Sequence, residues 1–412
     1  MTDLPFNGPE ERRRRLVAGL RASGALHDDT VAAALSLVPR HVFLPQIDLE
    51  RAYADDAVPT KLDAEGRPIS SSSQPAIMAL MLEQLDVRPG QRVLEIGAGT
   101  GYNAACLACL AGDAGRVTTV EIDDDLAAGA REHLAACGFS QVSVVCGDGG
   151  LGWPPDAPYD RIIATVGAWD ITPAWIGQLA PGGRLVLPLA LRGALQYSVA
   201  FEPAGDHLAS VSILPCGFMR LRGAFAGPET VVRLGERIGL LVEDTARPAG
   251  AEDLTGMLTQ PGQAIGTGVQ ITGRDLYAGL SLWLATREPT GIGRLSDPPA
   301  APGSARPAPR RGSRILLTSA HGCATVVPVG GPPAGAGDMF EAGTRPYGSE
   351  GFQLAERLAG HIRDWDAAGR PSLTDLRIGV YPEGTALPAA AGATVIAKPH
   401  TRLVLTWQDG GS

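Results

Sequence analysis

A strand, a glycine-rich turn and a helix follow one another in the stretch VLEIGAGTGY, residues 93–102. Glycine allows positive φ and lets the backbone approach a ligand closely. In an open α/β sheet, such a turn at the carboxyl end of a buried strand binds a nucleotide or a related cofactor. The stretch therefore predicts a cofactor site at one edge of a sheet.

Two classes of cofactor compete for this turn. Dinucleotide enzymes use the spacing GxGxxG, with the N-terminus of the following helix aimed at a pyrophosphate. Here Gly97, Gly99 and Gly101 give GxGxG, and Glu95 precedes them. A carboxylate repels a phosphate but not a sulfonium or an amino group, because only the phosphate carries a like charge. The turn therefore favours S-adenosylmethionine (SAM) over a nicotinamide dinucleotide.

Two further acidic residues lie at the ends of the next two predicted strands. Glu121 comes 20 residues after Gly101, where a carboxylate can accept hydrogen bonds from both ribose hydroxyls. Asp148, in a turn with Gly147, can accept a hydrogen bond from an adenine amino group. The alternatives are a surface acid at a strand end for Glu121 and a plain turn for Asp148.

Four consecutive hydroxyl side chains stand directly before a predicted helix at residues 75–85. They are Ser70, Ser71, Ser72 and Ser73, and Gln74 and Pro75 follow them. Proline is preferred at the first position of a helix, so this position suits a helix start. The serines are either a flexible linker or a substrate-facing edge that donates hydrogen bonds to an anionic group.

The elements around these residues alternate between strand and helix. The pattern predicts strands at 92–96, 116–121, 142–145, 159–165 and 183–189, helices at 102–111, 124–137 and 173–179, and a hairpin at 196–214. Short apolar strands separated by helices predict a sheet covered on both faces. We expect an α/β fold with a doubly wound, mostly parallel, Rossmann-like sheet, preceded by a helical segment at 10–38 and a loop that extends to residue 69.

The length of 412 residues indicates more than one domain. Residues 1–224 are predicted to form the SAM-binding catalytic domain, and residues 225–288 a connecting segment. Residues 289–312 are rich in proline and predict a linker or a long loop. Residues 313–412 predict a C-terminal α+β module, which we expect to recognise the substrate.

The composition and the net charge argue against several classes of partner. The net charge of −9 argues against nucleic acid, because phosphate binding depends on clustered Lys and Arg. No apolar leader and no run long enough to span a bilayer is visible, so we expect a cytoplasmic protein without a membrane partner. Cys106 and Cys109 form a CxxC without a second pair, which favours buried small side chains over a redox or metal site. No histidine cluster indicates a metal.

Five stretches together resemble the protein-L-isoaspartate O-methyltransferases. They are VPRHVFLP (38–45), SSQPAIMALM (72–81), VLEIGAGTGYNAA (93–105), GDGGLGWPPDAPYDRIIAT (147–165) and LAPGGRLVLPL (179–189). The resemblance covers roughly residues 10–224. It implies transfer of the methyl group of SAM to the carboxylate of an isoaspartyl or aspartyl residue in a peptide or protein. The resulting ester closes to a succinimide, which hydrolyses to Asp or isoAsp.

The resemblance also implies roles for particular residues. Ser73 corresponds to the active-site serine of the family. The neighbouring residues that would line the substrate site are Ser70, Ser71, Ser72 and Gln74. The residues that would form the SAM pocket are Glu95, Gly97, Gly99, Gly101, Glu121, Gly147 and Asp148.

The acceptor is where this sequence departs from the family. Ser71-Ser72 replace the usual Thr-Ile, and about 190 residues follow the family's ordinary end. This extension, with RLAGHIRDWDAAGRP at 357–371, resembles that of actinobacterial homologues that methylate an aspartate in ribosomally made lanthipeptides or ω-ester peptides. The expected acceptor is therefore such a peptide. The alternatives are general repair of isoaspartyl proteins and a non-catalytic SAM-binding scaffold for a peptide.

Overall fold

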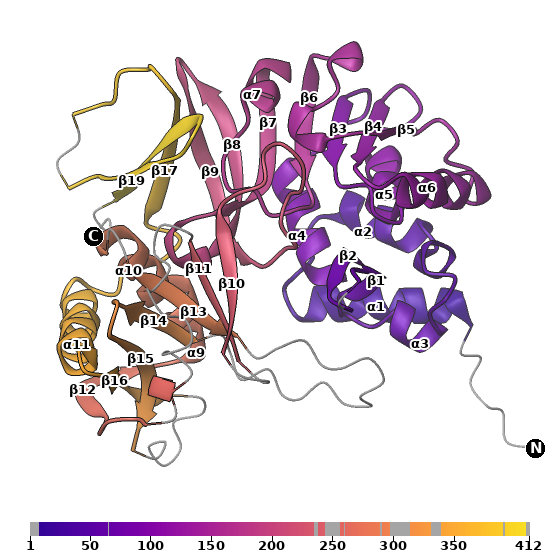
Figure 1. Cartoon of the computed structure of the whole chain (residues 1–412). Coiled ribbons are helices and arrows are strands. Elements are labelled where there is room, and N and C mark those ends of the chain that lie inside the picture. Colours follow the sequence, from indigo (N-terminus) through magenta and orange to yellow (C-terminus); the bar gives the residue numbers. More distant parts are fainter. Residues whose placement is uncertain are drawn as a thin grey trace, which may run out of the picture.

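The chain, seen here in a computed structural model, has a helix-rich N-terminal half beside a strand-rich C-terminal half (Figure 1). The structure describes residues 8–64, 66–234, 238–243, 256–258, 260–288, 291–296, 314–330, 339–389 and 392–408. Among the helices in these ranges, none is both long and apolar enough to cross a membrane.

Short helices open the described chain. They are α1 (Pro9–Ala22), α2 (Asp29–Leu37), the 3-10 helix η1 (Arg40–Phe43) and α3 (Leu49–Ala52). The Asp28 side chain caps α2 by accepting hydrogen bonds from the backbone N–H groups of Thr30 (2.7 Å) and Val31 (3.0 Å). The predicted helical segment and its break near residue 23 are confirmed.

The segment expected to be a loop contains a hairpin. Strands β1 (Val58–Leu62) and β2 (Pro68–Ser72) pair antiparallel, with Val58 opposite Ser72. The loop prediction is wrong for these residues. The sequence does not alternate clearly between apolar and polar side chains, because both strands are only partly buried and hydrogen-bond to each other alone. Three of the four serines therefore lie on a strand.

A ten-stranded sheet forms the centre of the molecule (Figure 1), in the order β18-β19-β17-β9-β8-β7-β6-β3-β4-β5. Its strands are β3 (Arg92–Ile96), β4 (Arg116–Glu121), β5 (Ser143–Cys146), β6 (Tyr159–Ala164), β7 (Leu179–Ala190), β8 (Gln196–Ala204), β9 (His207–Cys216), β17 (Leu376–Pro382), β18 (Thr394–Ala397) and β19 (Thr401–Trp407). Strands β3 to β7 are parallel, and the others add antiparallel. This confirms the predicted Rossmann-like sheet.

Two hydrophobic cores cover the two faces of this sheet. Along β3, Val93 packs into one core, and Leu94 and Ile96 pack into the other, as the two-residue period of a strand requires. The first core joins the sheet to α1, α2, α4 (Pro75–Leu85), α5 (Tyr102–Ala111) and α6 (Asp124–Ala136). The second core joins it to α7 (Pro173–Gln178) and to the C-terminal residues.

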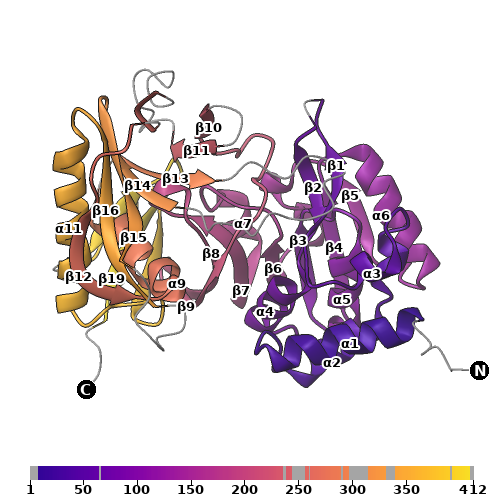
Figure 2. The same cartoon turned by 90° about the horizontal axis from the view of Figure 1, so that it is seen from below.

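A seven-stranded antiparallel sheet lies beside the first, in the order β10-β11-β13-β14-β15-β16-β12. Its strands are β10 (Glu229–Leu234), β11 (Ile238–Glu243), β12 (Ile265–Ile271), β13 (Ile292–Ser296), β14 (Arg314–Thr318), β15 (Gly322–Val329) and β16 (Phe340–Gly348). Figure 2 shows α11 (Gly351–Ala367) along the outer side of this sheet. The buried stripe of α11 is Leu354, Leu358, Ile362 and Trp365. The chain between β12 and β13 forms α9 (Gly273–Asp275), the π-helix η6 (Leu276–Leu280) and α10 (Ser281–Arg287).

The extension is therefore divided between two sheets. Residues 376–407 add to the catalytic sheet, with Gly379 and Val380 paired to Ala209 and Leu208 of β9. In the predicted linker, residues 292–296 form β13, which contradicts the linker prediction for them, and residues 297–312 lie outside the described residues. The other domain boundaries stay predictions.

Candidate functional site

A cavity of about 420 Å³ opens at the carboxyl ends of β3 and β4. This is the edge at which open α/β sheets bind ligands. Most of its wall comes from four segments, residues 69–74, 96–100, 120–122 and 215–222. The predicted glycine turn, the serines and the end of β4 thus meet around one cavity, and the segment after β9 completes it.

The glycine turn supplies the floor of this cavity at Gly97 and Gly99. Both residues have positive φ, 95° and 52°, and a Cβ on Gly97 would lie 2.9 Å from Thr165 Oγ1. Gly101 also has positive φ, 88°, but does not line the cavity. A Cβ there would lie 3.3 Å from the carbonyl oxygen of Ala130, so this glycine is required where α5 packs closely on α6.

Glu121 lies at the end of β4 and lines the cavity, although its side chain is largely buried. Its carboxylate accepts hydrogen bonds from the backbone N–H groups of Gly99 (2.8 Å), Ile122 (3.0 Å) and Asp123 (3.2 Å). A carboxylate offers about four acceptor positions, so one stays open toward the cavity. The backbone fixes the orientation of this acid, and its bond to Gly99 ties it to the glycine turn.

Glu95 lies behind the cavity wall instead of in it. Its side chain is fully buried, and its two oxygens accept hydrogen bonds from Asn103 Nδ2 (2.7 Å) and Thr119 Oγ1 (2.6 Å). Burial raises the pKa of this carboxyl group to about 7, and the two hydrogen bonds oppose the rise. Asn103 does line the cavity, so Glu95 acts on the wall through Asn103.

Gly147 and Asp148 also lie outside the cavity wall. The Asp148 carboxylate accepts hydrogen bonds from the backbone N–H groups of Gly150 (2.8 Å) and Ala224 (2.8 Å). It therefore caps the short helix η2 (Gly149–Leu151) and fixes the segment after β9. Gly149 is the residue of this turn that reaches the cavity.

The serine strand lies next to the glycine turn in the cavity wall. A Cβ on Gly99 would be 3.9 Å from Ser70 Oγ, which accepts a hydrogen bond from Thr60 Oγ1 (3.0 Å). All four serines line the cavity, and within the described chain only the Ser70 hydroxyl has a hydrogen-bond partner. The Ser73 hydroxyl is therefore available to a ligand in the cavity that Glu121 also lines.

The start of α4 is already occupied by a carboxylate. Asp55 Oδ1 accepts a hydrogen bond from the backbone N–H of Ala76 (2.8 Å), and Gln74 Nε2 donates to Asp55 Oδ2 (3.1 Å) and to its carbonyl oxygen (3.2 Å). Gln74 lines the cavity, but its amide nitrogen is engaged on the outer side. A negative charge at a helix N-terminus is favourable, so Asp55 stabilises this junction.

The comparison with known families is consistent with this arrangement. The family model for Protein-L-isoaspartate(D-aspartate) O-methyltransferase (PCMT) matches residues 11–222. The chain belongs to this family. It is therefore a SAM-dependent methyltransferase, and SAM is its cofactor.

Individual members of the family resemble the chain closely. The protein-L-isoaspartate O-methyltransferase of Methanopyrus kandleri is 45% identical over 221 residues, which are 53% of this chain and 95% of that protein. Protein-L-isoaspartate O-methyltransferase 1 of Rhodopseudomonas palustris is 45% identical over 210 residues, 50% of this chain and 82% of that protein. A solved structure of a protein-L-isoaspartate O-methyltransferase covers 89% of this chain and 96% of its own, with a TM-score of 0.51 and 25% identity.

The residues of the cavity fit SAM. Glu121 offers a fixed acceptor, and Gly97 and Gly99 leave the backbone open to close approach. The buried Oδ1 of Asn103, on the wall, has no partner and suits a donor such as the ammonium group of SAM. The volume is also within the usual range of ligand sites. Among the described residues, no group of three His, Cys, Asp or Glu side chains could hold a metal ion.

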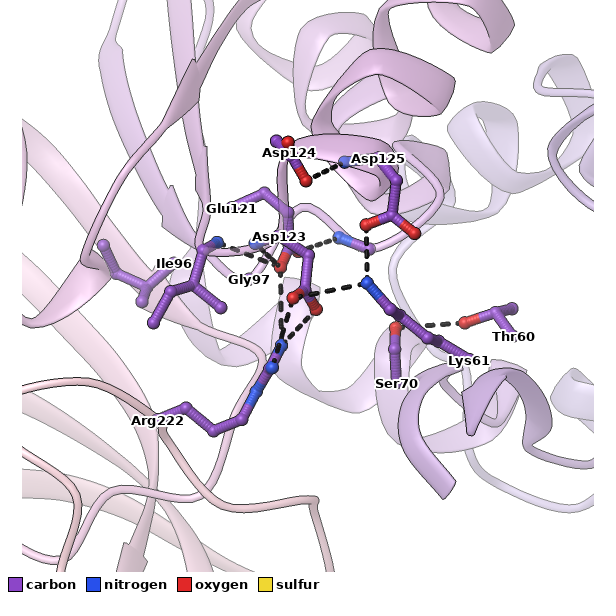
Figure 3. Close-up of polar contacts among 12 residues, drawn as sticks. Thr60, Lys61, Ser70, Ile96, Gly97, Glu121, Asp123, Asp124, Asp125 and Arg222 are labelled. Atoms are coloured by element: carbon purple, nitrogen blue, oxygen red, sulfur yellow. Dashed lines mark hydrogen bonds and ion pairs between the residues drawn. The ribbon is translucent and has the colours of Figure 1, made fainter. Parts of the chain in front are cut away.

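Charged side chains from distant segments meet at the edge of the cavity (Figure 3). Arg222 donates two hydrogen bonds to Asp123, from Nη1 to Oδ1 (3.3 Å) and from Nη2 to Oδ2. The same Nη2 lies 3.9 Å from Glu121 Oε1. Lys61 Nζ, from β1, lies 2.5 Å from Asp125 Oδ1 and 3.3 Å from Asp123 Oδ1. Asp123 thus connects the hairpin that carries the serines to the segment after β9.

Sequence reasoning missed these residues and also Arg40. Arg222 and Asp123 are 99 positions apart, and no local pattern connects them. Arg40 lies within VPRHVFLP, a stretch that resembles the family but gives no sign of a role for this residue. The one available signal was an arginine among apolar residues, because a fully buried arginine is rare and requires polar partners.

Proposed function

We propose that this enzyme methylates the free carboxylate of isoaspartyl residues in proteins and peptides, with Ser73 orienting the acceptor. The single observation that carries the proposal is that residues 70–73 and the glycine turn with Glu121 line one and the same cavity. An acceptor held by the serines would therefore lie in the same cavity as a methyl donor held by the glycine turn.

The relatives support an isoaspartyl acceptor. Those described above share this activity in their names, and the matches cover most of their length. The solved enzyme of the same name also covers 89% of this chain, so the extension by itself does not require an unusual acceptor. The general repair reaction is therefore better supported than the peptide-specific reaction that the sequence suggested.

The cofactor residues in this proposal are those on the cavity wall. Gly97 and Gly99 would contact SAM through their backbone, and Glu121 would accept a hydrogen bond from a ribose hydroxyl at its open acceptor position. Glu95, Gly101, Gly147 and Asp148 would act indirectly, since they hold the wall in place without lining it.

The chemistry requires positioning more than acid–base catalysis. SAM supplies an electrophilic methyl group when bound. The acceptor carboxylate is already ionised at neutral pH, because an unperturbed carboxyl group has a pKa of about 4, so no general base is needed. Its oxygen forms the new C–O bond as the C–S bond breaks, and both electrons of that bond stay on sulfur. Ser73 would donate a hydrogen bond to the second carboxylate oxygen and fix the line of attack.

The methyl ester explains how such a reaction repairs a protein. An ester is a better electrophile than a carboxylate, so the adjacent backbone nitrogen attacks it, releases methanol and forms a succinimide. Hydrolysis of the succinimide yields Asp or isoAsp. These later steps need no group of the enzyme.

A second acceptor is an aspartate in a ribosomally made, modified peptide. The observation that favours it is Ser71-Ser72, which line the cavity where relatives are expected to have Thr-Ile. Smaller polar side chains there would leave room for a bulkier or cyclic acceptor.

The two acceptors can be separated by one labelling experiment. Purified enzyme is incubated with SAM labelled on the methyl group and with three peptides: an isoaspartyl hexapeptide, its aspartyl twin and a macrocyclic form of the aspartyl peptide. We expect base-labile labelling of the isoaspartyl peptide with the highest kcat/KM. Labelling of the macrocycle alone would reject the repair proposal in favour of the second acceptor, and labelling of none would reject both.

A further inference from the structure

Arg40 lies in the core directly behind the serine wall. The residue is completely buried, and its guanidinium donates hydrogen bonds from Nη2 to the carbonyl oxygen of Ser73 (2.9 Å) and from Nε to that of Ala52 (3.0 Å). Nη1 lies 3.8 Å from Met78 Sδ, and the guanidinium carbon is 4.9 Å from the ring centre of Tyr102. Three of these four neighbours, Ser73, Met78 and Tyr102, line the cavity.

Among the described residues, no carboxylate forms an ion pair with Arg40, and Asp55 acts on its charge only at longer range. The hydrogen-bond partners of Arg40 are all neutral, although burying an unpaired charge is costly. Burial lowers the pKa of Arg40, yet arginine stays protonated in proteins. A permanent positive charge therefore sits one layer of side chains behind the place proposed for an anionic acceptor.

The other positive groups near this place are engaged. Asp55 occupies the start of α4 through Ala76, which offsets the positive end of that helix. Of the two arginines on the cavity wall, Arg222 pairs with Asp123, and Arg220 donates to the carbonyl oxygen of Gly227.

We propose that Arg40 is a positioning residue for methyl transfer, which fixes Ser73 through its carbonyl group and favours a charged acceptor over a neutral one. The inference rests on the proposed function, since it requires an acceptor that binds at Ser73 as a carboxylate. It also accounts for product release, because methylation removes the negative charge that Arg40 attracts.

A purely structural role would have a different signature. Arg40 joins η1, α3 and the start of α4, so its removal also costs stability. Structural damage would weaken binding of charged and neutral ligands alike. Loss of a positioning charge would weaken the charged ligand selectively, because only that ligand feels the missing field.

The experiment compares the full-length wild type with Arg40→Lys, Arg40→Met and the control Arg161→Met. Arg161 is also a buried arginine that donates to backbone carbonyls, those of Asp86 (3.1 Å) and Asp160 (2.9 Å), but it lies at the start of β6, away from the cavity. For each protein the affinities of an isoaspartyl hexapeptide and of its neutral carboxamide analogue are measured, together with kcat and the affinity for SAM.

We expect Arg40→Met to lower the preference for the carboxylate peptide over the carboxamide about tenfold. We also expect it to lower kcat by about 10- to 100-fold, because small displacements of positioning groups are that costly. Arg40→Lys should retain most of the preference but not kcat, and Arg161→Met should change neither. An unchanged preference in Arg40→Met overturns the inference while the proposed function stands. A wild type that methylates neither isoaspartyl nor aspartyl peptides overturns both.

Discussion

Replacing Glu95 with glutamine should make the enzyme more stable at neutral and alkaline pH without weakening SAM binding. The Glu95 carboxyl group is fully buried, with Asn103 Nδ2 and Thr119 Oγ1 as its hydrogen-bond donors. A glutamine of the same shape can accept from Asn103 Nδ2 and donate to the Thr119 oxygen, which leaves Asn103 Oδ1 free for the cofactor. The substitution therefore removes a buried charge and keeps the hydrogen bonds.

The size of the effect follows from the pKa of Glu95. Burial raises it to about 7 in the folded protein, against the ordinary value of 4.5. Because the folded-state pKa is the higher one, the protonated group favours folding at low pH, and this advantage disappears as the pH rises through about 7. The free energy of unfolding therefore falls by on the order of 3 kcal/mol as the carboxyl group ionises, most of it between pH 5 and pH 8. Glutamine does not titrate and avoids this loss.

The assay is thermal unfolding of both proteins at intervals between pH 5 and pH 8. Other titrating groups are common to both proteins, so the difference in Tm isolates Glu95. We expect little difference at pH 5 and an advantage of a few degrees for Glu95→Gln at pH 8. A difference that is flat across this range, or that favours the wild type at pH 8, would refute the argument. A large loss of SAM affinity would instead mean that the Glu95 carboxylate contacts the cofactor, as the sequence suggested.

Three other substitutions test separate parts of the site. Ser73→Ala should lower kcat about 100-fold, as loss of one oriented donor does elsewhere, while calorimetry shows unchanged SAM affinity; equal loss of SAM binding would reject the assigned role. Asp123→Asn should weaken SAM binding about three- to tenfold in calorimetry at low salt, because Arg222 would then pair with Glu121, the proposed ribose acceptor. An unchanged Kd for SAM would show that the ion pair between Arg222 and Asp123 does not keep Glu121 free. Thr401→Val should lower the free energy of unfolding by about 1 kcal/mol in denaturant titrations, because it removes a hydrogen bond to buried Asp170 (2.5 Å). An unchanged free energy of unfolding would show that this contact does not stabilise the extension.

Most of the parallel strands were predictable from sequence because they are buried on both faces. In RVLEI, residues 92–96, four of five residues are buried, so apolar residues on both faces of the strand, interrupted only by Glu95, mark it. The edge strand β5 is only partly buried, and its apolar pair Val144-Val145 is the weaker signal. The hairpin at 58–72 gave no such signal, because its residues are mostly half-exposed and polar. Its pairing depends on where the chain on either side is held, which the local sequence does not contain.

The sequence predicted those residues of the candidate site whose positions are determined by the backbone. Gly97 and Gly99 were expected at the ligand because a turn with positive φ requires glycine, and Glu121 because the end of the next parallel strand reaches the same edge. Glu95 and Asp148 were expected at the ligand too. The Glu95 carboxylate instead accepts from buried side-chain donors, and the Asp148 carboxylate accepts from backbone N–H groups. Spacing along the chain places a residue near an edge without fixing which way its side chain points.

The C-terminal extension does not form a separate module, because it pairs with the catalytic sheet and shares a hydrophobic core with it. Strand β17 pairs with β9, and β9 leads directly into residues 215–222 of the cavity wall. Asp170, in the loop after β6, also accepts hydrogen bonds from the backbone N–H of His400 (2.7 Å) and from Thr401. Removing the extension would expose the edge of β9 and open the core that both parts share. A role of the extension in acceptor choice is therefore better tested by point substitutions along these contacts than by truncation.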